Sequence, residues 1–260
     1  MRQNRPLRLW RDGQSTVGAW LSAPGGHTAE VLAHAGFDWL CVDCQHGLID
    51  YGAMVEMLRA ISTTETTPFV RVAANDPATL MRALDAGAYG VVVPLINDRE
   101  DAERAVHACR YPPQGGRSAG PIRAGIYGGP DYVAQANQEI AVICMIETAE
   151  ALANLDDILT VEGLDAIYIG PSDLAYALGL EPTGDNDDPR HVAAVTEIHQ
   201  ACRRAGVPAG IHTGSPEFAQ RWLDMGFQMV TLGSDTGFLR NRARAELAQL
   251  QRRTDAPDDS

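Results

Sequence analysis

Short apolar runs alternate with longer segments in which apolar residues recur at helical spacing, along almost the whole chain. The short runs are rich in β-branched and aromatic residues and predict eight strands. They cover residues 17–22, 38–43, 68–72, 90–94, 141–147, 166–170, 208–212 and 228–233. Strands that alternate with helices are typical of a parallel sheet.

The segments between these runs carry helix signals at both ends. Thr28 begins a helical pattern that Gly36 ends, and Asp76 begins a second pattern that Gly87 ends. In both cases a buried strand follows the glycine almost at once. This short helix-to-strand step recurs along the chain and favours a regular architecture.

A final helix is predicted at about residues 237–251. Eight strands with seven helices between them predict a single (β/α)8 TIM barrel domain over residues 1–260. A doubly wound open sheet is the alternative, although no G-x-G-x-x-G motif follows the first strand.

Residues 111–130 interrupt the alternation with a long connection that is rich in glycine and proline and holds two arginines. Connections of this length are usually functional or interfacial, and a solvated surface loop is the other interpretation. The acidic residues 254–260 are predicted to be a frayed tail.

The charge balance excludes some partners. The chain has 34 acidic and 21 basic residues, a net charge of -13. Such a surface repels nucleic acid and anionic membranes, so we expect neither as a partner. All the basic residues are arginines, and the lack of lysine excludes Schiff-base enzymes, pyridoxal phosphate enzymes and Walker A NTPases.

The five cysteines are odd in number and lie mostly within apolar runs, which predicts buried thiols in a reducing compartment. Cys41 and Cys44 form a C-x-x-C pattern, but no second pair follows at zinc spacing. The N-terminus lacks the apolar segment of a signal peptide, and no eighteen apolar residues run together. A cytoplasmic enzyme is therefore expected.

Polar residues stand where the predicted strands end, and the catalytic residues of a barrel gather at that end of the strands. These residue types are unfavourable to bury without a partner. They are Asp43, Gln45, His46, Arg71, Glu147, Gly170, Ser172, Asp173, His212, Ser234 and Asp235.

Glu147 and Asp173 lie one strand-helix unit apart, so their carboxylates should project into the same mouth of the barrel. Two hard oxygen ligands with room for water suit Mg²⁺ or Mn²⁺. The alternative is that each residue caps the helix that follows it.

Three further positions are candidates, and the first two have two interpretations each. His46 on a loop suits a general base, or it is a turn histidine bonded to backbone. Arg71 within a buried strand needs an anion, which is either a substrate or Asp43 on the adjacent strand. The turn from Gly170 into a helix exposes backbone N–H groups that can hold a carboxylate or phosphate.

Five runs together resemble one family, the HpcH/HpaI aldolases. They are LCVDCQHG (40–47), VRVAANDPATLMRALDAGAYGVVVP (70–94), MIETAEAL (145–152), IGPSDLAYALG (169–179) and VTLGSD (230–235). The resemblance spans roughly residues 15–250 in consistent order. This family comprises class II pyruvate aldolases, including the 4-hydroxy-2-oxoheptanedioate and 2-dehydro-3-deoxyglucarate aldolases.

The resemblance implies a metal-dependent reaction, the reversible cleavage of 4-hydroxy-2-oxo acids to pyruvate and an aldehyde through a metal-bound pyruvate enolate. It implies that Glu147 and Asp173 hold a divalent cation, Mg²⁺ or Mn²⁺, with Co²⁺ or Zn²⁺ as further candidates. It also implies that the N–H groups of Gly170, Ser172 and Asp173 receive the pyruvate carboxylate.

The remaining roles follow from the same resemblance. Arg71 contacts the keto oxygen and stabilises the enolate charge, and His46 is the base. Asp85 of a neighbouring subunit orients His46. The family implies a hexamer, a trimer of dimers in which the C-terminal helix is exchanged between subunits.

The chain departs from the family pattern at Gln45, Met145, His212 and residues 116–120. These departures concern the aldehyde more than the chemistry. His212 could contact the acceptor aldehyde or the substituent on the pyruvyl unit, which is a hypothesis from its place at a strand end.

Three other functions are consistent with parts of the sequence. A citramalyl-CoA or malyl-CoA lyase shares the acidic pair, but the chain lacks a basic patch or extra C-terminal domain suited to CoA. A phosphate-binding barrel isomerase or epimerase is suggested by Gly233 and Ser234. A non-catalytic sugar-acid binding protein would leave the buried Arg71 without a purpose.

Overall fold

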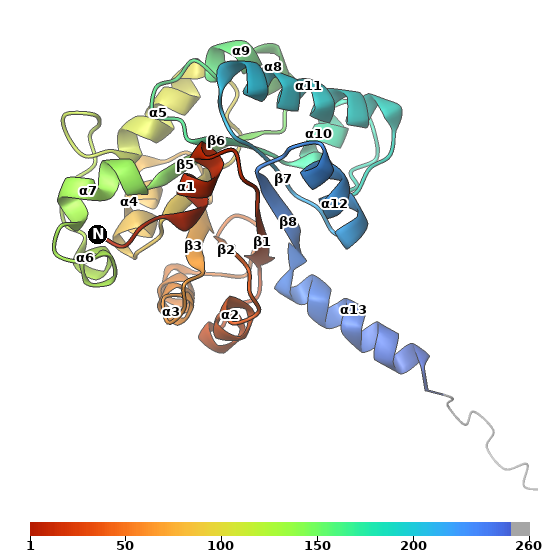
Figure 1. Ribbon diagram of the computed structural model, residues 1–260, viewed down its shortest axis with the longest axis horizontal. Helices are drawn as coiled ribbons and strands as arrows, with labels where there is room; N and C mark the ends of the chain where they lie inside the picture. The colour runs from red at the N-terminus through yellow and green to blue at the C-terminus, as the bar shows by residue number, and fades with distance from the viewer. Residues whose placement is uncertain (251–260) are drawn as a thin grey trace, which may run out of the picture.

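Eight parallel strands close into a barrel in a computed structural model that describes residues 1–250 (Figure 1). Each strand pairs with its neighbours in the chain, and β1 pairs with β8 to close the ring. The eight predicted strands are confirmed, with both ends of each strand within one residue of the prediction. The strands are β1 (Thr16–Leu21), β2 (Trp39–Asp43), β3 (Thr67–Arg71), β4 (Gly90–Val93), β5 (Ala141–Ile146), β6 (Ala166–Ile169), β7 (Ala209–Ile211) and β8 (Met229–Ser234).

Helices surround the barrel, and the architecture is a (β/α)8 TIM barrel, as predicted (Figure 1). Among the described residues they are α1 (Arg5–Arg11), α2 (Gly26–Ala33), α3 (Tyr51–Ile61), α4 (Pro77–Asp85), α5 (Arg99–Cys109), α6 (Ile122–Gly128), α7 (Tyr132–Glu139), α8 (Ala149–Ala153), α9 (Leu155–Ile158), α10 (Pro171–Ala177), α11 (Pro189–Ala205), α12 (Pro216–Asp224) and α13 (Asp235–Ala248). Asp76 caps α4, and its carboxylate accepts a hydrogen bond of 2.8 Å from the Thr79 N–H. The predicted start of α2 at Thr28 is wrong, because the helix begins two residues earlier, at Gly26.

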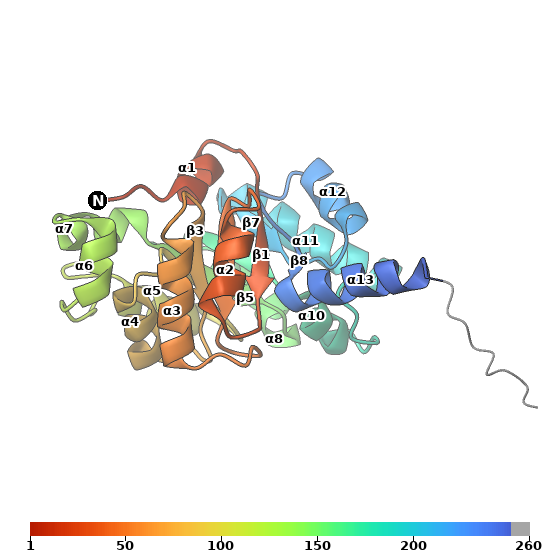
Figure 2. The same cartoon turned by 90° about the horizontal axis from the view of Figure 1, so that it is seen from below.

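The barrel is filled by large side chains, including Trp20, Trp39, Phe69 and Tyr168. Helix α1, which the sequence did not predict, lies across the end of the barrel where the strands begin (Figure 2). Its Trp10 is buried there, with its ring centroid 6.0 Å from that of Phe69. Helix α1 therefore closes this end, and the opposite end is left to hold a site.

The connection at residues 111–130 is not one irregular loop, because α6 occupies residues 122–128. Arg117 anchors the part before α6. Its guanidinium is buried, donates a 2.7 Å hydrogen bond to Asp85 and contacts the hydroxyl of Tyr132. The segment is thus held against α4 and α7 and is not a solvated surface loop throughout.

The last described helix, α13, begins at the barrel and projects away from it (Figures 1 and 2). Asp235 at its start is buried and accepts hydrogen bonds from the backbone of Ser22 and Ala23. Leu239 and Leu247 are exposed along the rest of the helix. The predicted tail at residues 254–260 lies outside the described residues, and within them no helix is long and apolar enough to cross a membrane.

Candidate active site

The end of the barrel opposite α1 collects most of the predicted site residues, because parallel strands all finish at that rim. Asp43 ends β2, Arg71 ends β3, and Glu147 directly follows β5. Gly170 follows β6, and His212 follows β7.

Asp43 and Arg71 face each other across neighbouring strands, because they are partners in the register of β2 with β3. The Arg71 Nε and Nη2 atoms donate hydrogen bonds of 2.8 and 2.6 Å to the two carboxylate oxygens of Asp43. Burial alone would raise the pKa of Asp43, but the hydrogen bonds and charge of Arg71 outweigh it and lower that pKa. Of the two interpretations of Arg71, the salt bridge to Asp43 is present. Nη1 of Arg71 makes no hydrogen bond within residues 1–250.

Glu147 is 2% exposed, and its carboxylate lies between two backbone segments. Its Oε1 accepts a 2.9 Å hydrogen bond from the N–H of Leu95, a residue with a φ of 55°. Its Oε2 lies so close to Gly170 that a β-carbon there would overlap it. The register of β5 with β6, which pairs Ile146 with Ile169, sets Glu147 and Gly170 side by side.

Asp173 lies in the first turn of α10, close enough to Glu147 for its charge to act on it. Burial raises the pKa of Glu147, the Leu95 N–H lowers it, Asp173 raises it and Arg71 lowers it, and the net shift is upward. Because no side chain caps α10, the N–H groups of its first turn are open to a ligand. The His191 Nε2 lies 3.0 Å from the Pro171 carbonyl oxygen and ties this turn to α11.

The charges of the mouth suit a divalent cation. Asp43, Glu147 and Asp173 carry three negative charges against the single positive charge of Arg71, an excess of two. Within residues 1–250, no three histidine, cysteine or acidic side chains cluster as a metal site. Mg²⁺ is commonly bound by one or two carboxylates, with waters and substrate oxygens completing its coordination shell. Glu147 and Asp173 therefore fit a divalent cation.

His46 and Asp85 are not brought together within one chain. His46 lies on the exposed loop after β2, and its N–H donates a 3.3 Å hydrogen bond to Asp43. Asp85 ends α4 at the other end of the barrel, because helices run antiparallel to the strands, and its Oδ1 accepts from Arg117. The interpretation of His46 as a turn residue applies to its backbone, while its side chain makes no hydrogen bond within the described residues.

The sequence did not identify Trp20, which lies beneath the mouth. The guanidinium carbon of Arg71 is 4.6 Å from the centre of the Trp20 ring, and the His212 ring is 5.5 Å from it. The indole N–H donates hydrogen bonds of 3.0 Å to Tyr168 and to Thr231. Only the alternation of inward and outward positions along β1 could have indicated that Trp20 points inward.

All five cysteines are unpaired, and Cys41 and Cys44 do not form a disulfide. Burial raises the pKa of the Cys44 thiol to about 11, and the nearby charge of Asp43 adds to that effect. These thiols are therefore not activated nucleophiles.

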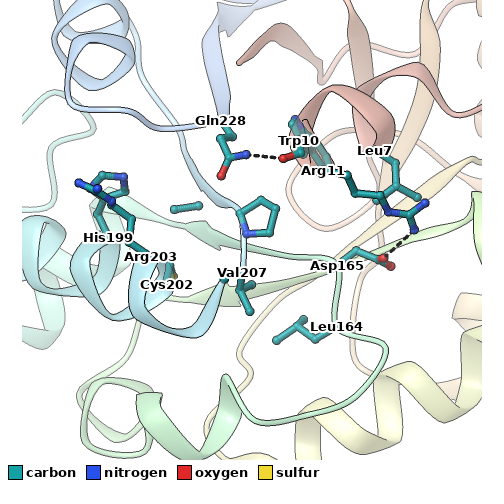
Figure 3. Close-up of a pocket in the computed structure, with 13 residues that line it drawn as sticks. Leu7, Trp10, Arg11, Leu164, Asp165, His199, Cys202, Arg203, Val207 and Gln228 are labelled. Atoms are coloured by element: carbon teal, nitrogen blue, oxygen red, sulfur yellow. Dashed lines mark hydrogen bonds and ion pairs between the residues drawn. The ribbon is translucent and has the colours of Figure 1, made fainter. Parts of the chain in front are cut away.

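A cavity also lies at the opposite end of the barrel, around the starts of β6, β7 and β8 (Figure 3). There Arg11 faces Asp165 at 3.9 Å, and the Gln228 amide donates to the carbonyl of Trp10 at 2.6 Å. Its lining includes none of the predicted site residues.

Comparisons with known proteins agree with one another. The chain matches the family described as HpcH/HpaI aldolase/citrate lyase over residues 16–242. It is 41% identical over 248 residues to a hydroxypyruvate/pyruvate aldolase of Rhizorhabdus wittichii, covering 95% of this chain and 99% of that protein. It is 40% identical over 239 residues to a 2-dehydro-3,6-dideoxy-6-sulfogluconate aldolase of Pseudomonas putida, covering 91% and 93%. A solved HpcH/HpaI aldolase/citrate lyase family protein from Burkholderia cenocepacia has a TM-score of 0.89 at 35% identity, covering 95% and 99%.

Proposed function

The chain belongs to the HpcH/HpaI aldolase/citrate lyase family and is a carbon-carbon lyase, and from this premise we propose that it reversibly cleaves 4-hydroxy-2-oxo acids to pyruvate and an aldehyde. The observation that carries the proposal is the mouth of the barrel, where an arginine fixed by Asp43 lies near the paired carboxylates of Glu147 and Asp173. Relatives named as aldolases of pyruvate and of a sugar acid support the substrate class.

Glu147 and Asp173 would hold a divalent cation, Mg²⁺ or Mn²⁺, which when bound withdraws electron density from the 2-oxo carbonyl. The open N–H groups of Gly170, Ser172 and Asp173 would receive the substrate carboxylate. Pro171 has no N–H, so only the N–H groups of the residues before and after it would donate to the carboxylate.

Arg71 would stabilise the negative charge that develops on the keto oxygen when the carbon-carbon bond breaks. Its Nε and Nη2 are committed to Asp43, which leaves Nη1 to reach the substrate. A guanidinium held in this way needs no reorganisation as the charge forms. Asp43 therefore acts as a positioning residue for Arg71.

His46 would move the proton. In cleavage it would take the proton of the 4-hydroxyl group as the carbon-carbon bond breaks and return it to the methylene carbon of the enolate. In the synthetic direction it would remove a methyl proton of pyruvate and pass it to the new alkoxide. Asp85 of the partner subunit would orient it, since the Asp85 Oδ2 makes no hydrogen bond within the described part of the chain. This role requires an oligomer, and we propose a hexamer built as a trimer of dimers in which α13 is exchanged.

We propose that the enzyme acts on small molecules in the cytoplasm, a reducing compartment in which its five unpaired cysteines would persist. Neither nucleic acid nor a membrane is part of this proposal.

The test is release of pyruvate from a 4-hydroxy-2-oxo acid, followed with lactate dehydrogenase and NADH. We expect activity with Mg²⁺ or Mn²⁺ and loss of it in EDTA. His46→Ala should lower kcat by about 100-fold or more, because a positioned base is worth that much. His34→Ala, at an exposed histidine at the end of the barrel where the strands begin, is the matched control. Activity that survives both EDTA and His46→Ala would overturn the proposal.

A further inference from the structure

His212 and Arg71 both lie where their strands end, and both contact the ring of Trp20. The backbone N–H of His212 donates a 3.3 Å hydrogen bond to the Ile169 carbonyl, which fixes the residue at the end of β7. Its ring turns into the barrel, where Nδ1 is 3.4 Å from the Tyr168 hydroxyl and the ring lies beside Trp20. The indole of Trp20 thus supports both His212 and Arg71.

The imidazole of His212 is uncharged at neutral pH. Burial and the nearby charge of Arg71 lower the pKa of His212 to about 4, against a smaller opposite effect of Asp43. A neutral imidazole has one N–H donor and one acceptor nitrogen. It therefore offers no positive charge to a second carboxylate and is suited to an uncharged polar group.

One ring nitrogen of His212 is left for a ligand. Nδ1 faces Tyr168, whereas Nε2 has no hydrogen-bond partner within residues 1–250, and the side chain remains partly exposed at the mouth. A substrate that fills the mouth removes water from this nitrogen. An unpaired polar group would then carry a desolvation penalty, so a substrate that offers a partner is favoured.

The network below His212 leaves both of its tautomers accessible. The Tyr168 hydroxyl shares a hydrogen bond with Thr231 in which either oxygen can donate, and both accept from the Trp20 indole. Nε2 is therefore a donor in one arrangement and an acceptor in the other. A hydroxyl group satisfies both arrangements, because it can donate and accept.

We propose that His212 selects substrates that carry a hydroxyl group next to the reacting carbonyl. Two sources share this chemistry: a hydroxylated 2-oxo acid donor, such as 3-hydroxypyruvate, and a hydroxyaldehyde acceptor, such as glycolaldehyde. The inference rests on the proposed aldolase function and deepens it by naming a substrate class.

The test compares His212→Leu, which removes the hydrogen-bonding nitrogen, with His212→Gln, which retains a polar terminus. Aldol addition is measured with pyruvate against 3-hydroxypyruvate, using acetaldehyde, and with acetaldehyde against glycolaldehyde, using pyruvate. The readout is the ratio of kcat/KM for the hydroxylated substrate to that for its matched partner.

In His212→Leu we expect this ratio to fall about 10- to 100-fold in one of the two comparisons, as expected for an unpaired buried polar group. The comparison in which it falls identifies the donor or the acceptor as the source. His212→Gln should restore at least part of the ratio. Ratios unchanged in both comparisons, or a ratio that His212→Gln leaves as low as His212→Leu does, would overturn the role of His212.

Metal-dependent deuterium exchange into the methyl group of pyruvate separates the two levels of the argument. If the unmodified protein shows no exchange, the proposed function and the selection by His212 fall together. If it shows exchange but the ratios do not respond to His212→Leu, only the role of His212 is overturned. Thermal unfolding of each variant establishes that it is folded.

Discussion

At the scale of single residues, Glu147 combines near-complete burial with a negative charge. A carboxyl whose pKa is raised on folding destabilises the folded state above that pKa. The penalty is absent below the ordinary pKa of a glutamate and grows as the pH rises from there through the raised value. A bound cation would offset it, so the folded, metal-free protein holds this charge at the expense of stability.

Glu147→Gln should therefore stabilise the protein in EDTA while it abolishes aldol cleavage. The amide oxygen can still accept from the Leu95 N–H, and the buried charge is gone. We expect the melting temperature at pH 8 to rise by roughly 2–4 °C, the equivalent of about 1 kcal/mol in a chain of this size. The difference should shrink toward pH 4, as Glu147 in the unmodified protein becomes protonated.

Glu147→Ala is the control for this prediction, since it removes both the charge and the acceptor for Leu95. It should be less stable than Glu147→Gln, because the Leu95 N–H is left unpaired in a cavity. If Glu147→Gln melted at a lower temperature than the unmodified protein at pH 8, the claim that the buried charge of Glu147 destabilises the fold would be contradicted.

Gly170→Ala should strongly reduce activity without unfolding the barrel. A β-carbon at this position overlaps the Glu147 Oε2, so the carboxylate must move away from residue 170 and out of its present position. We expect kcat/KM for cleavage to fall about 100-fold, because small displacements of catalytic groups have effects of that size. Gly125→Ala, where a β-carbon meets no atom within 4 Å, is the matched control in the activity and melting assays.

At the scale of elements, the strands were predictable because each is an almost continuously buried run between turn signals. Helix α1 was not predictable from the sequence. Four of its seven residues are arginine or proline, so the segment resembles an exposed chain terminus. Helix α6 lies in a Gly/Pro-rich segment that argues against a helix. Local pattern is weakest where tertiary contacts supply the stability.

The site was likewise predictable where the order of the strands determines it, and not where tertiary contacts do. The parallel barrel brings Arg71, Glu147 and Asp173 to one rim, so strand ends were sufficient to find them. The Leu95 N–H donates to Glu147 because Leu95 has a positive φ, and a leucine in the sequence does not predict that conformation. The contact of Trp20 with Arg71 depends on strand register, which composition does not reveal.

The connection before α6 is stabilised by Arg117, whose side chain is 0% exposed. Arg117→Met should lower the free energy of unfolding by about 2–4 kcal/mol in urea titration, because it leaves Asp85 facing a buried site without its partner. Arg117→Met combined with Asp85→Asn should recover part of that loss. Arg204→Met on α11, at an exposed arginine, should change stability little, and an equal loss there would contradict the anchoring role.

At the scale of the whole molecule, α13 projects away from the barrel (Figure 2). Some of its apolar side chains are exposed. Phe238, near the start of α13, stacks on Phe37. Farther along the helix, Leu239 is 74% exposed and Leu247 is 49% exposed, which is unfavourable for apolar side chains that face solvent. Asp85, meanwhile, lies at the end of the barrel away from His46 of its own chain. Both features agree with an assembly that completes each site with a neighbouring subunit.

Light scattering after gel filtration should give the mass of a hexamer for the unmodified protein. The pair of changes Leu239→Asp and Leu247→Asp should give a smaller species with reduced cleavage activity, because the exchanged helix no longer docks. Asn241→Asp adds a charge to the same helix without removing an apolar side chain and should keep the larger mass. A monomer in the unmodified protein would contradict the proposed assembly.

Exchange of deuterium from D₂O into the methyl group of pyruvate, followed by NMR, tests the central claim most directly because it needs no knowledge of the aldehyde. The account predicts exchange with Mg²⁺ or Mn²⁺, no exchange in EDTA, and little in Glu147→Gln. Exchange that is absent with every divalent cation, or that continues unchanged in EDTA, would contradict it.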